Sequence, residues 1–143
     1  MQHITVQTMR KLQSVGFCYP EYEGFLNYGM VFNYQGDDFY IGGLSGTPLG
    51  KELHWISTDG VWLPDSEQLL NWLQMANFNV SVQIDAKTLA FSILAIDNEN
   101  GAQYEAEAFN LVQCAANVVY KICKSQKRLY IPKSRLRIEI DDA

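Results

Sequence analysis

The glycine-rich segment 42–51 is the first part of this 143-residue sequence that could bind a ligand, because it ends in Gly50-Lys51 like a phosphate-binding loop. That loop requires four residues between its first glycine and the Gly-Lys pair, and Ser45 stands at the position where the glycine should be. Glu52 stands where the magnesium-binding serine or threonine should follow. We interpret the segment as a plain connection.

The acidic segment 97–101 resembles a calcium-binding loop in composition, but its spacing differs from that of such a loop. Its glycine, Gly101, is the fifth residue rather than the sixth, and Ala108 stands at the twelfth position, where a glutamate is needed. The Asn100-Gly101 pair instead predicts a tight turn between two antiparallel strands.

The histidines and cysteines show no metal-ligand spacing. His3 and His54 are the only histidines, and the three cysteines are Cys18, Cys114 and Cys123. We therefore predict no metal and no cofactor. A nucleophilic pair formed in space by Cys18 or Cys114 with His54 stays open, because such partners need not be close in sequence.

Two acidic pairs could serve as general acids or cation ligands. Asp37-Asp38 follows Gly36, and Glu105 and Glu107 share one face of an expected strand. Aspartates in turns and alternating glutamates on solvated strands are common structural features, so we interpret both pairs as structural.

Aromatic residues are concentrated in segment 17–40, which holds nine of the eighteen in the chain. Tyrosine-rich strands are typical of either a core or a contact surface, because the ring offers apolar area and the hydroxyl a hydrogen bond. If the segment is a contact surface, the candidate binding residues are Tyr19, Tyr22, Tyr28, Phe32, Tyr34, Tyr40 and Trp55.

Charge is distributed unevenly along a chain whose net charge is −5. Residues 121–137 contain seven of the eleven basic residues and no acidic one. This basic strip could contact an acidic partner, or it could neutralise the acidic remainder of the chain. An acidic protein repels nucleic acid over most of its surface.

The elements that position these residues are best defined in segment 58–125. Apolar residues at helical spacing predict helices at about 66–77 and 110–124, the first opened by a capping box formed by Asp65 and Gln68. Between them, alternating patterns predict three antiparallel strands, of which 89–96 is so apolar that we expect it to be central and covered on both faces. The sequence therefore predicts an α+β fold with an α-β-β-β-α core.

The flanking segments are expected to add to this core within a single domain, residues 1–143. Residues 4–15 predict a short helix ending at Gly16, and segment 1–57 contains an aromatic β-hairpin, with strand 26–34 paired to 39–41 and a further short strand at 53–57. Segment 126–143 predicts a charged strand at a sheet edge, which would allow homodimerisation. The sequence starts with neither a secretory signal nor a membrane span, and its three cysteines do not suggest a disulfide framework; we expect a cytoplasmic protein.

An α-β-β-β-α order is also found in double-stranded-RNA-binding domains. In that family a lysine cluster opens the second helix, whereas segment 104–110 here is acidic, so we expect no nucleic-acid binding in that mode.

Segment 59–125 resembles a small α-β-α sandwich domain of phage and prophage accessory proteins, through Trp62-Leu63-Pro64-Asp65, the three-strand meander and Tyr104-Glu105-Ala106-Glu107-Ala108. The resemblance implies a phage or mobile-element context and no catalytic residues.

Three functional hypotheses follow. The first is a non-enzymatic interaction protein that binds a protein partner through its aromatic hairpin or charged tail. The second is a small-molecule or nucleotide binder that uses the aromatic face and loop 42–51. The third is an enzyme whose site forms from Cys18, Cys114 or His54 and a carboxylate.

Overall fold

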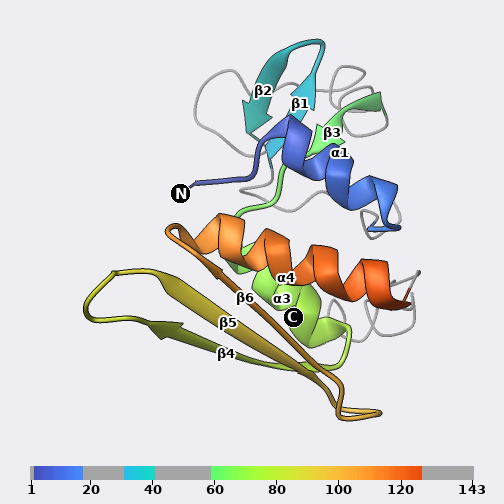
Figure 1. Cartoon of the computed structure of the whole chain (residues 1–143). Coiled ribbons are helices and arrows are strands. Elements are labelled where there is room, and N and C mark those ends of the chain that lie inside the picture. Colours follow the sequence, from blue (N-terminus) through green and yellow to red (C-terminus); the bar gives the residue numbers. More distant parts are fainter. Residues whose placement is uncertain (1, 18–30, 41–58, 127–143) are drawn as a thin grey trace, which may run out of the picture.

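The computed structural model describes residues 2–17, 31–40 and 59–126, and these form the α+β fold that the sequence predicts (Figure 1). The described elements are α1 (Val6–Ser14), β1 (Val31–Tyr34), β2 (Asp37–Tyr40), β3 (Val61–Trp62), α3 (Ser66–Met75), β4 (Phe78–Ile84), β5 (Phe91–Asp97), β6 (Gln103–Ala108) and α4 (Leu111–Gln126). The strands of the described segments form two three-stranded antiparallel sheets, in the orders β2-β1-β3 and β4-β5-β6.

The predicted α-β-β-β-α core is present as α3, the meander β4-β5-β6, and α4. Helix α3 begins at a capping box, in which the Asp65 carboxylate accepts from the Gln68 amide N–H at 2.8 Å and the Gln68 side chain accepts from the Asp65 N–H at 3.0 Å. Helix α4 is capped by Asn110, whose side-chain oxygen accepts from the Gln113 amide N–H at 2.7 Å. Both caps satisfy backbone donors that an α-helix leaves free in its first turn.

The two helices cover one face of the meander. Along β5, Ile93, Ala95 and Asp97 are buried, whereas the intervening Ser92, Leu94 and Ile96 are partly exposed. β5 is therefore the central strand, as predicted, but the expectation that it is covered on both faces was wrong. Apolar residues on the outer face remain partly in contact with solvent, because the described elements place both helices on the inner face (Figure 1).

The second sheet is built on the predicted hairpin. Gln35 and Gly36, the two residues between β1 and β2, have φ values of 53° and 88°, the pattern of a type I′ turn, which is tighter than the four-residue turn expected from the sequence. Val31 and Phe32 are both buried, so β1 does not alternate between a buried and an exposed face at this end. Strand β3, which pairs with β1, is only two residues long and was not predicted.

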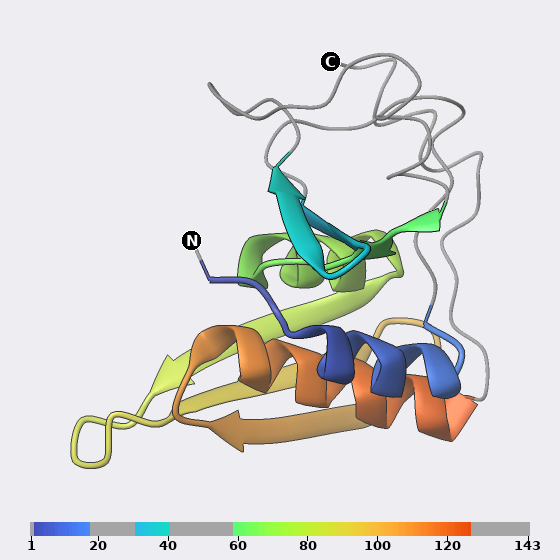
Figure 2. The ribbon, with the colours of Figure 1, turned by 90° about the horizontal axis from the view of Figure 1, so that it is seen from above.

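The elements are arranged in layers. The meander lies below α3 and α4, and α1 packs against the opposite side of α4 (Figures 1 and 2). Helix α1 begins after its N-cap Thr5 and buries Met9 and Leu12, as its spacing predicts. The small sheet is joined to this body through Phe17, whose ring lies 6.1 Å from that of Trp62 in β3 and 4.7 Å from that of Trp72 in α3.

Three predicted features lie outside the described residues: the strand at 53–57, the loop at 42–51 and, beyond Gln126, the charged tail strand. Asp97-Asn98-Glu99-Asn100-Gly101 forms the predicted turn between β5 and β6, with Gly101 at a φ of 75°.

Replacing Asp65 by alanine should lower the free energy of unfolding by about 1 kcal/mol, because the capping box of α3 is lost. Urea denaturation of the full chain measures this value. Glu67→Ala, an exposed substitution in the same turn that leaves both capping hydrogen bonds, should cost less than about 0.5 kcal/mol. Equal losses in the two variants would contradict a specific role for the cap.

Candidate functional site

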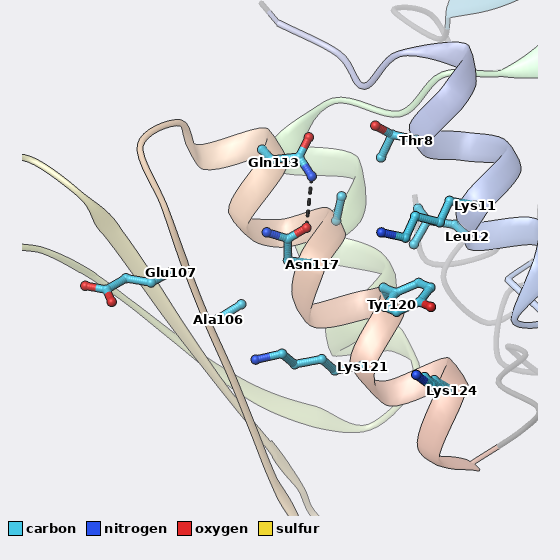
Figure 3. A pocket seen from close by; sticks show the side chains of 11 residues that line it. Thr8, Lys11, Leu12, Ala106, Glu107, Gln113, Asn117, Tyr120, Lys121 and Lys124 are labelled. Atoms are coloured by element: carbon cyan, nitrogen blue, oxygen red, sulfur yellow. Dashed lines mark hydrogen bonds between the residues drawn. The ribbon is translucent and has the colours of Figure 1, made fainter.

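A groove of about 490 Å³ runs over α4, between α1 on one side and β6 on the other (Figure 3). From α4 it is lined by residues three and four apart in sequence, which share one face of a helix. The described residues that line it are Thr8, Lys11 and Leu12 of α1, Ala106 and Glu107 of β6, and Gln113, Ala116, Asn117, Tyr120, Lys121 and Lys124 of α4.

The centre of the groove is the ring of Tyr120, which two lysines from different helices approach. The Nζ of Lys11 lies 4.9 Å from the ring centroid, and the Nζ of Lys124 lies 5.9 Å from it. Both distances are within the range of cation–π attraction, worth about 0.5–1 kcal/mol at an exposed site. Two ammonium groups, from positions more than a hundred residues apart in sequence, therefore lie close to the same ring.

Polar groups continue along the same face of α4. Gln113 donates through its side-chain nitrogen to the Asn117 side-chain oxygen at 2.9 Å (Figure 3). Lys121 donates to the backbone carbonyl of Glu105 in β6, which ties the helix to the edge of the sheet. The Glu107 carboxylate is directed away from α4 (Figure 3). The groove thus offers a positive charge excess with amide and hydroxyl groups beside it.

Cys114 lies on the buried face of α4, in surroundings that do not favour a nucleophilic thiolate. Cys114 is buried, and its Sγ donates weakly to the backbone carbonyls of Ala106 at 3.4 Å and Phe91 at 3.5 Å. Burial raises the pKa of the Cys114 thiol above its ordinary value, so the reactive thiolate is disfavoured at neutral pH. Cys123 is also buried, whereas Cys18 and His54 lie outside the described residues.

Of the predicted aromatic site residues, the three that the structure describes, Phe32, Tyr34 and Tyr40, do not line this groove. Phe32 is 1% exposed and belongs to the core, so it cannot contact a partner; Tyr34 is partly buried and Tyr40 is 53% exposed. Tyr19, Tyr22, Tyr28 and Trp55 lie outside the described residues. Binding through the aromatic hairpin therefore stays a prediction, now without Phe32.

The acidic pairs also have structural surroundings. Asp38 accepts from the Asn33 side chain at 2.8 Å across the β1–β2 hairpin, and its other oxygen lies 3.7 Å from Nε2 of His3. Glu105 lies on the outer face of the meander, within 3.5 Å of the Ser92 hydroxyl. Within residues 2–17, 31–40 and 59–126 no group of three or more histidine, cysteine, aspartate or glutamate residues could hold a metal ion.

Sequence reasoning identified only part of the groove. Lys121 and Lys124 belong to the basic strip 121–137, one of the two contact surfaces that the sequence suggests, whereas no pattern in the sequence points to Lys11, Thr8 or Tyr120. The available signal was the polar stripe on α4, in which Gln113, Asn117 and Lys121 follow one another at intervals of four residues.

None of the helices in the described segments is long and apolar enough to span a membrane. Comparisons with protein families, curated proteins and solved structures found no match.

Proposed function

We propose that this chain is a non-enzymatic binding protein whose groove over α4 takes a small phosphate-bearing ligand. The observation that carries the proposal is that Lys11 and Lys124, from two different helices, reach the same Tyr120 ring in a groove that Lys121 also lines. Lysine is a common phosphate ligand because its ammonium group acts as a compact charge with three donors. The phage or mobile-element context implied by the resemblance of segment 59–125 is part of the same proposal.

Lys11 and Lys124 are available to a ligand, whereas Lys121 already donates to the Glu105 carbonyl. In the described segments none of the three forms an ion pair with a carboxylate, since the one ion pair there joins His3 and Asp38. Lys11 and Lys124 are exposed, and their contacts are with the Tyr120 ring, which does not neutralise their charge. An anion could therefore bind both ammonium groups without first breaking a salt bridge.

The size and surroundings of the groove favour a small ligand over a polymer. A volume of about 490 Å³ falls in the range of small-molecule sites, roughly 300–1,000 Å³. A long polyanion would also meet the acidic remainder of a chain with net charge −5, which repels it. A ligand with one or two phosphate groups would meet only the local positive charge.

Binding without catalysis is the best match to the chemistry of the lining. Among the residues that the structure describes, the ionisable groups lining the groove are the three lysines, Tyr120 and Glu107. The Glu107 carboxylate points away from α4 (Figure 3). A general base must lie within hydrogen-bond reach of the proton it removes, and Glu107 does not reach the centre of the groove. Amide and hydroxyl donors such as Gln113 and Thr8 are suited to orienting a ligand.

The test uses the full chain and pyrophosphate as the probe. Isothermal titration calorimetry should show saturable binding that weakens as salt is raised, because exposed charge pairs are screened. Lys11→Gln should weaken binding by about tenfold, as expected for the loss of one charge-assisted contact of about 1.5 kcal/mol.

Arg10→Gln is the matched control, because it removes one positive charge from the same helix at an exposed position that does not line the groove. This variant should bind pyrophosphate within about twofold of the unmodified chain. The proposal fails if pyrophosphate does not bind at about 1 mM, or if the two variants weaken binding equally.

A further inference from the structure

Strand β4 is an outer strand of the meander and carries no charged residue. Its sequence, Phe78-Asn79-Val80-Ser81-Val82-Gln83-Ile84, contains neither proline nor glycine, and β5 is its one strand partner among the described residues. Edge strands usually carry lysines, prolines or bulges that prevent pairing with another chain. β4 has none of these protective residues along its seven positions.

The hydrogen-bond alternation shows which backbone groups of β4 face outward. The Asp85 N–H donates to the Ala90 carbonyl, and the Asp97 N–H donates to the Ala102 carbonyl. Asp85, next to the end of β4, is therefore in a hydrogen-bonded pair with the β5 side. Because bonded and non-bonded pairs alternate along an antiparallel ladder, the other odd-numbered residues of β4 also direct their backbone groups to β5. The N–H and C=O groups of Val80, Val82 and Ile84 therefore point away from the sheet.

The opposite edge of the sheet is protected. By the same alternation, Gln103, Glu105 and Glu107 present their backbone groups outward on β6, and two of these three residues are charged. The Lys121 ammonium group occupies the Glu105 carbonyl and adds a further charge at that edge. One edge of the sheet thus resists strand pairing while the other permits it.

Apolar side chains are exposed along the unprotected edge. Val82 is 42% exposed and Ile84 is 60% exposed, and the pairing of Val82 with the buried Ile93 places both side chains on the inner face of the sheet. Two further exposed apolar residues lie at the end of the sheet where the β4–β5 turn stands. Leu89, in that turn, is 66% exposed, and Phe109, directly after β6, is 79% exposed. A monomer would leave this group of side chains in water.

We propose that β4 pairs in antiparallel orientation with β4 of a second copy of this chain, about a two-fold axis, to give a continuous six-stranded sheet. In such a pair residue i lies opposite residue 2c − i, where c is the residue on the axis, so even-numbered residues always face even-numbered ones. With the axis at Val82, Val82 lies opposite its own copy and Val80 lies opposite Ile84, both through their outward backbone groups and through apolar side chains on one face.

The symmetry is the reason for choosing a second copy as the partner. A charged partner strand would place its charges beside neutral residues of β4, which cannot form ion pairs with those charges. A second copy of β4 is itself neutral, and its even-numbered residues also direct their backbone groups outward. An isologous contact of this kind closes at two copies, because each copy uses the same edge of its meander. The proposal does not depend on ligand binding in the groove.

Sedimentation velocity of the full chain, over a range of concentrations, tests the proposal. The unmodified chain should sediment as a dimer, and Val82→Pro should raise the dimer dissociation constant by at least about tenfold, because each copy loses an outward N–H. Glu107→Pro is the matched control, since it removes an outward N–H from the other edge and should leave the dimer unchanged. Val82→Lys, which keeps the backbone donor but places like charges near the axis, should weaken the dimer by a similar factor.

Far-UV circular dichroism establishes that each variant is folded. A chain that stays monomeric up to about 1 mM would overturn the proposal. So would folded Val82→Pro and Val82→Lys variants that dimerise as tightly as the unmodified chain, because the second copy would then dock elsewhere.

Discussion

Replacing Ile93 by alanine should lower the free energy of unfolding by about 3–4 kcal/mol. Ile93 lies at the centre of β5, is fully buried, and is paired with Val82 on one side and Ala106 on the other. Removing its branched side chain leaves a cavity between the sheet and the helices that small neighbours such as Ala106 cannot fill. Chemical denaturation of the full chain, monitored by circular dichroism, gives the value.

Leu94→Ala is the matched control, because it truncates the next residue of the same strand on the opposite, partly exposed face. It should cost roughly 1 kcal/mol, since less apolar surface is removed from a buried position. Equal losses at Ile93 and Leu94 would mean that both faces of β5 are covered, as its sequence alone suggested, and would contradict the one-sided packing described above.

Reversing two charges of the groove, in a Lys11→Glu/Lys124→Glu variant, should weaken pyrophosphate binding by at least about a hundredfold. Two charge-assisted contacts of about 1.5 kcal/mol each are lost, which corresponds to about a factor of a hundred before repulsion is added. Isothermal titration calorimetry at low salt measures the change. The effect should shrink as salt is raised, because the groove is open to solvent.

The control for this variant carries the same net charge. Each lysine-to-glutamate or arginine-to-glutamate change shifts the charge by −2, so Arg10→Glu/Lys87→Glu also moves the chain from −5 to −9. Arg10 and Lys87 do not line the groove. If this control weakens binding as much as the groove variant, net charge rather than the groove governs binding, and the proposed site is wrong.

Much of the fold could be predicted because local patterns specify it. Asp65, Gln68 and Asn110 are capping residues whose partners lie within three positions, and Gly101 follows the asparagine of a hairpin turn. These signals depend on neighbouring residues alone, so they remain valid whatever the rest of the chain does.

The missed features depend on contacts between distant segments. The apolar run at 89–96 shows that β5 is central, but its residues do not show that both helices lie on one side of it. Strand β3 is two residues long, and its pairing with Phe32 and Asn33 has no local pattern. Val31 is buried because it belongs to the same hydrophobic core as the helices and the meander, and no local pattern in β1 reveals this contact.

The groove could not be predicted for the same reason. Lys11 and Lys124 come from helices at opposite ends of the described chain, and only the packing of α1 on α4 brings both to Tyr120. In the sequence, Lys11 is an isolated base on a short helix and Tyr120 is one aromatic residue at the edge of an apolar stripe. The basic strip 121–137 indicated a charged surface but not the partner that completes it.

The most direct measurement of the central claim is a ¹H–¹⁵N NMR titration of the full chain with pyrophosphate. If Lys11, Tyr120 and Lys124 form one binding site, saturable amide shifts should cluster on the facing sides of α1 and α4 and be absent from the β1–β2 hairpin and the β4–β5 turn. Shifts that cluster in either of those two regions, or that do not saturate at any concentration, would contradict it.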